Sequence, residues 1–165
     1  MIKIPYIVVI LGATATGKTK LAVRLAQNIG GEIISADSRQ IYKGLDIGTG
    51  KDLQEYKIDN CEIPHHLIDI RTIDEPYSVY DFQRDAIQSI EQITNNNKIP
   101  IICGGTGLYI EALLLNYRFS TFSQNELLRD KLSNLSIAEL ENLSKQLNIN
   151  KNIEKNNRHR YIRAI

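Results

Sequence analysis

A loop near the N-terminus carries the residue types that bind phosphate. Its sequence satisfies the pattern GxxxxGK[ST] at every position. In such a loop the backbone N–H groups and the start of the following helix face an anion, while the lysine adds a positive charge. The last residue, Thr19, has a hydroxyl placed to hold a Mg²⁺ ion that bridges phosphate oxygens. The residues predicted to bind a diphosphate or nucleotide are Gly12, Ala13, Thr14, Ala15, Thr16, Gly17, Lys18 and Thr19.

A second candidate for chemistry is the carboxylate of Asp37. Residues 32–38 have the pattern of a short strand that ends in polar residues. Ligands of open α/β sheets bind outside the carboxyl ends of the strands, so a carboxylate at this position could act as a general base. The alternative is that Asp37 only caps a turn or a helix. The pattern itself leaves both interpretations open.

The residues around these candidates predict an α/β fold. Residues 7–11 are almost continuously apolar, as expected for a buried parallel strand. Apolar residues then recur at helical spacing over residues 21–29, until two glycines end the helix. We expect a P-loop NTPase-like parallel sheet flanked by helices. Further strands are expected at 32–38, 66–70 and 99–103, and further helices from Ser78 to 95–97 and from Leu108 onward.

Two other stretches are expected near the ligand. Residues 104–107 are a second glycine-rich turn between a strand and a helix, so one site could form from two loops. Residues 44–51, which contain further glycines, are predicted to be a loop beside it, whereas the polar residues 52–62 are predicted to be a surface connection. The pair His65 and His66 lacks Cys or Glu at metal-binding spacing, so a structural role is favoured.

Beyond residue 115 the sequence becomes polar and helical. We expect a P-loop core at residues 1–117 and a small helical appendage at 118–165, with helices over 125–134, over 137–147 and from 154 onward. Residues 156–163 form a basic cluster with an aromatic residue inside it. Such a cluster is either a solvated helix face or a contact with nucleic acid, and composition does not decide between them.

Bulk properties exclude several classes of protein. Among 165 residues, 42% are hydrophobic and the net charge is +1, so a nucleic-acid partner would need a local basic patch. The 2 cysteines fit neither a disulfide framework nor a zinc pattern. No apolar segment approaches the ~20 residues that span a bilayer, and a secretory cleavage site would destroy the phosphate loop. We expect a cytoplasmic monomer.

Several blocks of this sequence together resemble one enzyme family. They are residues 12–19, 34–42, 46–49, 63–69, 75–78 with 82–86, 104–109 and 157–164. In this order they resemble the tRNA dimethylallyltransferases, also called isopentenyl-tRNA transferases. The phosphate loop alone occurs in many enzymes, whereas the combination is specific. The blocks span essentially the whole chain.

The resemblance implies transfer of a dimethylallyl group from dimethylallyl diphosphate to N6 of the adenosine on the 3′ side of a tRNA anticodon. The phosphate loop and Mg²⁺ would stabilise the leaving diphosphate, and Asp37 would accept the amine proton. Thr106 resembles a residue that forms a hydrogen bond at the reaction centre. The base would be extruded from the anticodon stem-loop into the pocket. Expected tRNA contacts are Asp37, Ser38, Arg39, Gln40, Arg129, His159, Arg160, Tyr161, Ile162 and Arg163.

Two alternatives remain beside this interpretation. The phosphate loop is also compatible with ATP binding in a small-molecule or nucleotide kinase, where Asp69 could supply a further magnesium ligand. Members of the resembling family continue beyond the last block, whereas this chain ends at Ile165. The helical appendage is therefore expected to be truncated, and an inactive tRNA-binding fragment is the other alternative.

Overall fold

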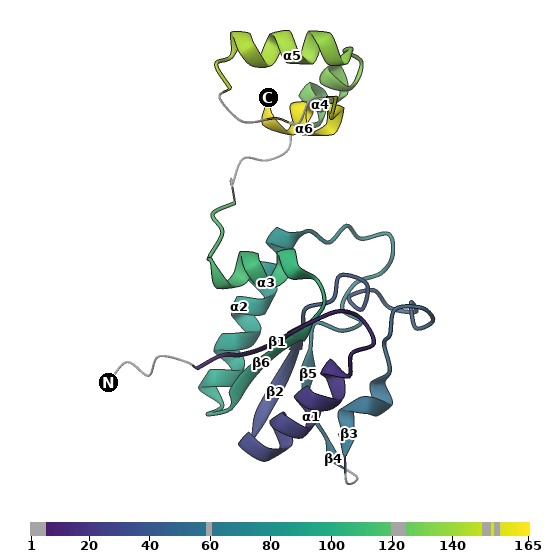
Figure 1. Ribbon diagram of the computed structural model, residues 1–165, viewed down its shortest axis with the longest axis vertical. Coiled ribbons are helices and arrows are strands. Elements are labelled where there is room, and N and C mark those ends of the chain that lie inside the picture. Colours follow the sequence, from purple (N-terminus) through teal and green to yellow (C-terminus); the bar gives the residue numbers. More distant parts are fainter. Residues whose placement is uncertain (1–5, 59–60, 120–124, 150–152, 154–155) are drawn as a thin grey trace, which may run out of the picture. The chain divides into compact units, whose positions relative to one another are not determined.

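The computed structural model describes residues 6–58, 61–119, 125–149, 153 and 156–165 (Figure 1). The chain divides between Phe119 and Ser120 into two compact units, which are described separately below. The boundary expected from the sequence lay between residues 117 and 118. In the described ranges, none of the helices has the length and apolar content needed to cross a membrane.

The first unit is built on a parallel sheet with the strand order β1-β6-β2-β5. The register pairs Leu11 with Gly104 and Ser35 with Cys103, so three strands end at nearly the same level. The phosphate loop, the second glycine turn and Asp37 each follow one of these ends. The strands are β1 Val8–Leu11, β2 Gly31–Ser35, β5 His65–His66 and β6 Ile99–Gly104.

Helices cover both faces of this sheet (Figure 1). Side chains alternate between the faces of a strand. Accordingly Ile33 of β2 packs in the hydrophobic cluster of α1, while its neighbour Ile34 packs in the cluster of α2 and α3. This arrangement confirms the expected α/β fold. The helices are α1 Lys18–Ile29, α2 Val79–Asn95 and α3 Gly107–Leu114.

One strand prediction is wrong for most of its length. The strand expected over residues 66–70 is present only at its start, in β5, His65–His66. Leu67 and Asp69 have φ of 61° and 54°, in the left-handed region that an extended strand excludes. The backbone N–H of Asp69 instead donates to the carbonyl oxygen of Gln40 at 3.0 Å. The chain after β5 therefore lies beside the turn that follows β2.

The connection over residues 52–62 also has more structure than its polarity indicates. It contains a short 3₁₀ helix, η1 Leu53–Tyr56, and a small antiparallel hairpin of β3 Lys57–Ile58 and β4 Cys61–Glu62. Tyr56 is buried and packs in the hydrophobic cluster that contains α1. One side of the connection therefore belongs to the core.

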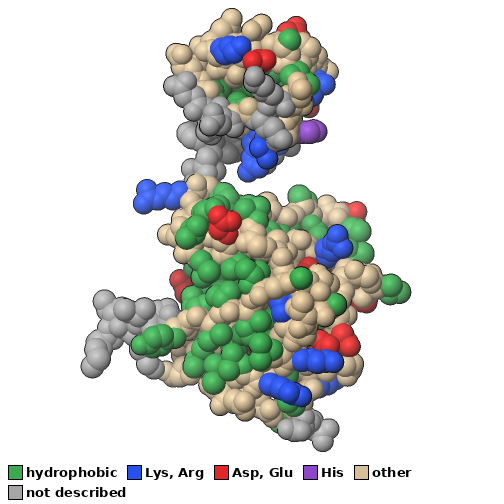
Figure 2. Space-filling model, viewed as in Figure 1, with side chains coloured by type: hydrophobic (Ala, Val, Ile, Leu, Met, Phe, Trp, Pro, Cys, Tyr) green, Lys and Arg blue, Asp and Glu red, His purple; other side chains and the backbone are tan. Residues whose placement is uncertain are grey.

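Strand β1 lies at an edge of the sheet. Among the described strands it pairs with β6 alone. Its residues from Val8 to Ile10 are partly exposed and Leu11 is 58% exposed, although the strand consists of apolar residues. Figure 2 shows hydrophobic side chains gathered on this face of the first unit, over the region that β1 and α3 occupy in Figure 1. This edge is an apolar surface that the described residues leave open.

The second unit contains α4 Glu126–Ser133, α5 Ile137–Gln146 and α6 Arg158–Ala164. The first two match the helices predicted over 125–134 and 137–147. The third was expected from residue 154, which lies outside the described residues; α6 begins after Asn157, whose side chain accepts from the backbone N–H of Arg160. Leu132, Leu140 and Tyr161 form the buried centre of this unit.

Candidate active site

The phosphate loop connects β1 to α1. Gly17 precedes the helix with φ 81° and Ala15 has φ 62°, so the backbone turns through the left-handed region at both positions. Thr16 Oγ1 and Lys18 Nζ both donate to the carbonyl oxygen of Ala13, at 2.8 and 2.5 Å. The lysine ammonium therefore lies against the loop itself, where an anionic phosphate would be a stronger acceptor than a carbonyl.

A cavity of about 530 Å³ opens beside this loop. One side is formed by Thr14 to Lys20, the opposite side by residues between Asp46 and Tyr56, and further lining comes from Cys103, Gly104 and Gly105. Asp37 and Gln40, from the segment after β2, also line it. The predicted residues that line this cavity are Thr14, Ala15, Thr16, Gly17, Lys18, Thr19, Asp37 and Gln40. Five predicted residues do not line it, although each lies within two positions of a residue that does: Gly12, Ala13, Ser38, Arg39 and Thr106.

Asp37 occupies a turn that the second glycine junction holds in place. Its Oδ1 accepts from the backbone N–H of Arg39 at 2.9 Å. Thr106 Oγ1 accepts from the backbone N–H of Ser38 at 3.0 Å, and it donates to Ser38 Oγ at 3.4 Å. The carboxylate of Asp37 thus caps a local turn and lines the cavity at the same time. The capping interpretation and the catalytic interpretation are compatible.

Gly104 allows the ends of β6 and β2 to approach each other. A Cβ atom at this position would lie 2.2 Å from the carbonyl oxygen of Ala36, far closer than any side-chain carbon tolerates. The backbone N–H of Thr106 donates to the same oxygen at 3.1 Å. Glycine is therefore required here for close contact between two backbones, which brings Asp37 beside the glycine turn.

The opposite side of the cavity contains a charged residue that sequence reasoning missed. Lys51 has a side chain that is only 1% exposed, and its Nζ lies 2.7 Å from Asp46 Oδ1 and 2.5 Å from Asp69 Oδ1. It also donates to the carbonyl oxygen of Tyr42 at 3.0 Å. Burial lowers the pKa of Lys51, but the hydrogen bonds to both carboxylates outweigh this and leave the pKa raised. A lysine directly after a glycine loop was the available signal.

The amide of Gln40 links β2 to this same loop. Its Oε1 accepts from Ser35 Oγ at 3.1 Å, and its Nε2 donates to the carbonyl oxygens of Gly50 at 3.3 Å and Thr49 at 3.5 Å. Both ends of the amide are thereby engaged by protein groups. In this arrangement Gln40 orients the wall of the cavity, and its expected contact with a base would require one of these bonds to be exchanged.

Cys103 lines the cavity at the end of β6. Burial raises the pKa of this thiol to about 11, although the nearby positive charge of Lys18 acts in the opposite direction. The nucleophilic form of cysteine is the thiolate. At neutral pH Cys103 is therefore a protonated, inert wall residue, and the carboxylate of Asp37 is the better candidate for proton transfer.

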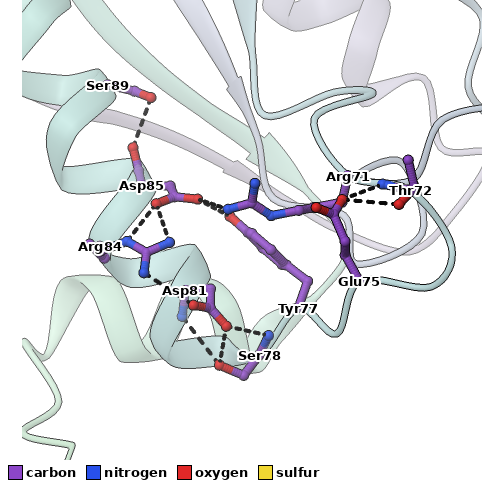
Figure 3. Close-up of polar contacts among 9 residues, drawn as sticks. All are labelled: Arg71, Thr72, Glu75, Tyr77, Ser78, Asp81, Arg84, Asp85 and Ser89. Atoms are coloured by element: carbon purple, nitrogen blue, oxygen red, sulfur yellow. Dashed lines mark hydrogen bonds and ion pairs between the residues drawn. The ribbon is translucent and has the colours of Figure 1, made fainter. Parts of the chain in front are cut away.

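A network of polar contacts joins α2 to the segment that precedes it (Figure 3). Asp85 accepts from Tyr77 Oη at 3.1 Å and lies 2.8 Å from Arg84 and 3.7 Å from Arg71. The guanidinium of Arg71 also lies over the ring of Tyr77, 5.6 Å from its centroid. The carbonyl oxygen of Arg71 accepts from the backbone N–H of Lys43 at 2.8 Å. The turn after β2 is thus connected to α2.

The start of α2 is fixed by a reciprocal cap, also drawn in Figure 3. Ser78 accepts from the backbone N–H of Asp81 at 3.3 Å, while the Asp81 carboxylate accepts from the backbone N–H of Ser78 at 2.9 Å. This pattern confirms the helix start predicted at Ser78. It satisfies backbone donors that a helix end leaves unpaired, and so stabilises the helix that carries Asp85.

The second unit has a groove of its own, of about 630 Å³, between residues of α4 and α6. Arg129, predicted as a tRNA contact from a distant part of the sequence, lines this groove together with His159, Ile162 and Arg163. Arg158 also lines it and donates to the carbonyl oxygen of Ser133. The structure thus collects cationic side chains of two helices around one groove.

Two predicted RNA contacts lie elsewhere in this unit. Arg160 is exposed on α6 but does not line the groove. Tyr161 is 5% exposed and packs with Leu132 and Leu140 in the centre of the unit. The expectation that the Tyr161 side chain contacts RNA is therefore corrected: in this fold it is a core residue.

Comparison with known proteins agrees with the blocks in the sequence. The model of the IPP transferase family matches residues 40–165. A tRNA dimethylallyltransferase 2 of Treponema denticola is 53% identical over 142 residues, which cover 86% of this chain and 46% of that protein. A tRNA dimethylallyltransferase 1 of Syntrophus aciditrophicus is 54% identical over 126 residues, covering 76% and 41%. The chain spans about half the length of the curated relatives it matches.

Solved structures give the same result for the fold. The full-length tRNA isopentenylpyrophosphate transferase of Bacillus halodurans is similar with a TM-score of 0.65 and 39% identity, over 96% of this chain and 53% of that one. A eukaryotic dimethylallyltransferase described as acting on tRNA gives a TM-score of 0.77 at 30% identity, over 96% and 40%. With the phosphate loop and Asp37 lining one cavity and the family model matched over most of the sequence, the chain belongs to the IPP transferase family.

Proposed function

We propose that this chain carries the reaction centre of a tRNA dimethylallyltransferase, which transfers a dimethylallyl group from its diphosphate to N6 of the adenosine on the 3′ side of the anticodon. The observation that carries this proposal is that the phosphate loop and Asp37 line the same cavity of about 530 Å³. A leaving-group site and a proton acceptor are the two parts that transfer to an amine requires. The curated relatives bear the same enzyme name.

The phosphate loop would bind the diphosphate of the donor. Backbone N–H groups at the start of α1 face this region, and Lys18 adds a cationic donor. The hydroxyl oxygen of Thr19 on the wall of the cavity fits Mg²⁺, which binds through few protein oxygens and through substrate phosphates. Mg²⁺ held by Thr19 would neutralise charge that develops on the leaving diphosphate.

Asp37 would act on the acceptor amine. As the bond between the allylic carbon and the diphosphate oxygen breaks, the nitrogen forms a bond to that carbon, and the electron pair leaves with the diphosphate. The nitrogen then loses a proton, which the Asp37 carboxylate accepts. Thr106 holds Ser38 by the two hydrogen bonds described above and thereby fixes the turn that contains Asp37.

The groove of the second unit is the proposed contact with tRNA. Arg129, Arg158 and Arg163 line it, and arginine side chains pair readily with phosphate oxygens. Binding that neutralises phosphates releases counterions, so the logarithm of the affinity should fall linearly with the logarithm of salt concentration. Replacing Arg163 by Ala should reduce that slope by about one unit or less. A slope unchanged by substitution of all three arginines would contradict this contact.

A transfer assay tests the reaction itself. The chain is incubated with labelled dimethylallyl diphosphate and tRNA, and in parallel with labelled ATP and small acceptors, because a kinase is the competing function. Asp69, which could have supplied a magnesium ligand in a kinase, instead lies 2.5 Å from Lys51. Label should appear in tRNA and not in phosphorylated acceptors; phosphoryl transfer without prenyl transfer would reverse the assignment. We also propose that the protein acts as a monomer in the cytoplasm, where tRNA is found.

A further inference from the structure

Lys51 is a buried cation that the proposed reaction does not use. Its side chain is 1% exposed, and within the described ranges no other charged residue is classed as buried. A buried ammonium is retained at a high cost in desolvation unless close acceptors surround it. Its position on the wall of the reaction cavity therefore requires an explanation.

Three segments of the chain meet at the Lys51 ammonium. The acceptors are the carbonyl oxygen of Tyr42 in the turn after β2, Asp46 in the glycine loop, and Asp69 in the segment after β5. An ammonium group has three N–H donors. These acceptors engage all of them, so Lys51 has no donor left for a phosphate. Lys18, in the same cavity, contacts only a carbonyl oxygen of its own loop among the hydrogen bonds of the described residues.

The contacts of Gln40 close this junction into a ring. Its carbonyl oxygen accepts from the backbone N–H of Asp69 at 3.0 Å, and its side chain donates to the carbonyl oxygen of Gly50 at 3.3 Å. Gly44, Gly48 and Gly50 have positive φ and no atom near the position of a Cβ. The glycine loop therefore has little packing of its own, and its position depends on these polar ties.

We propose that Lys51 is a positioning residue for the acceptor side of the cavity, holding the glycine loop and the turn after β2 in the places from which Gln40 and Asp37 meet the acceptor. This inference rests on the proposed function for the identity of the acceptor. The ring itself does not depend on it. Lys51 thus acts through its neighbours and touches neither diphosphate nor base.

The test replaces Lys51 by Met in the complete chain. Lys43→Met is the matched control, because Lys43 is an exposed lysine next to Tyr42, which accepts a hydrogen bond from Lys51. Hydrogen exchange of backbone amides and calorimetric binding of inorganic diphosphate are measured on both. In Lys51→Met, exchange of the hydrogen-bonded amides of residues 42–43 and 69–71 should accelerate by at least about tenfold, while α1 and β6 change little. The affinity for diphosphate should stay within about twofold of the unsubstituted chain, since phosphate contacts come from the other wall. Lys43→Met should match the unsubstituted chain in both measurements.

Each other outcome overturns the inference. A loss of diphosphate affinity as large as in Lys18→Ala would make Lys51 a phosphate ligand. Faster exchange throughout the sheet would reduce its role to general stability, and unchanged exchange of the amides of residues 42–43 and 69–71 would show that Lys51 does not hold the ring. Where transfer is measurable, kcat should fall with the KM for dimethylallyl diphosphate unchanged. Absence of transfer in every variant would count against the proposed function alone, because the exchange result is read independently.

A second variant covers the case in which Lys51→Met fails to fold. Asp46 is 68% exposed, so Asp46→Asn removes one arm of the junction without leaving a buried charge uncompensated. Protease cleavage within residues 44–50 should then accelerate, while exchange of the hydrogen-bonded amides of residues 69–71 should remain slow. Equal protection of the loop in Asp46→Asn and the unsubstituted chain would contradict the inference.

Discussion

The two walls of the reaction cavity are built on different principles. The phosphate loop follows a strand directly, leads into a helix, and presents backbone N–H groups with the ammonium of Lys18, which among the described residues bonds to its own loop alone. The wall opposite contains Asp46, Gly48 and Lys51, and side-chain contacts from distant segments hold it in place. Both walls contain a lysine, but one ammonium is available to a ligand and the other is consumed by the protein.

This difference separates binding from orientation. A loop that binds through its backbone needs only its local conformation, which the adjoining strand and helix provide. A wall that is proposed to place a carboxylate and an amide against a nucleobase needs contacts that cross the fold, because small displacements of catalytic groups reduce rates strongly. Substitutions in the first wall should therefore change affinity for diphosphate, and substitutions in the second should change turnover.

The largest expected effect is that of Asp37→Asn, which removes the proposed proton acceptor and keeps the size of the side chain. The rate of prenyl transfer in single-turnover experiments should fall by about 10²–10⁴-fold. Affinity for inorganic diphosphate should be nearly unchanged. Asparagine is as good a cap as aspartate, so a pure capping role would leave the rate almost unaffected. A decrease of less than about threefold would be too small for a lost general base, and the division between the walls would not hold.

Gly104→Ala should disrupt the close contact between the ends of β6 and β2. The added methyl carbon would lie 2.2 Å from the carbonyl oxygen of Ala36, and neither backbone can move without displacing a strand. The free energy of unfolding should decrease by about 3 kcal/mol, at the upper end of the cost of overpacking. Urea unfolding measures this decrease. Gly107→Ala is the control, since no atom lies within 4 Å of its Cβ position; equal losses in both variants would refute the steric argument.

Lys18→Ala tests whether the phosphate loop determines the affinity for diphosphate. Loss of one charge-assisted hydrogen bond should weaken diphosphate binding by about 1.5–3 kcal/mol. The side chain donates to the carbonyl oxygen of Ala13 at the exposed surface of the loop, so thermal stability should be unchanged. Calorimetry with inorganic diphosphate measures the affinity, and a thermal unfolding curve measures the stability. Retained affinity in a folded variant would remove Lys18 from the phosphate site.

The smallest expected effect is a pH dependence at the end of β6. Burial raises the pKa of Cys103 from 9.0 to about 11, so the folded chain holds this proton more tightly than the unfolded chain does. The resulting stabilisation is fully present below pH 9.0 and is lost as pH rises through about 11. It should amount to no more than about 2 kcal/mol. Unfolding free energies measured across this range should decline less steeply for Cys103→Ala; identical slopes would contradict the assigned burial effect.

The fold was predictable where neighbouring residues determine the structure. The strand at residues 99–103, the cap at Ser78 and the helix of α1 all follow from periodicity and capping, which are local signals. The segment after β5 was not predictable, because Asp69 has a left-handed backbone and its N–H bonds to Gln40 in a distant part of the chain. Hydrophobic pattern alone cannot distinguish such a segment from a strand.

The candidate site shows the same limit. Asp37 and the phosphate loop both follow strand ends, so the parallel sheet expected from the sequence already predicted that they lie close together. Lys51 was missed because its partners, Asp46 and Asp69, are identified only by the folded chain. Tyr161 was expected to contact RNA because it lies in the C-terminal block that resembles the family, yet its face of α6 packs with Leu132 and Leu140. The sequence indicated the basic residues of α6 but not which of its residues are buried.

The exposed position of β1 has a consequence for the behaviour of this chain in concentrated solution. An apolar edge strand presents unpaired N–H and C=O groups to any extended segment that meets it, and natural proteins protect such edges with charges, bulges or a covering element. Val8, Val9 and Ile10 provide no charge, and β6 is the only described strand beside them. Self-association through this edge would increase with protein concentration and remain insensitive to salt, in contrast to the proposed binding of RNA.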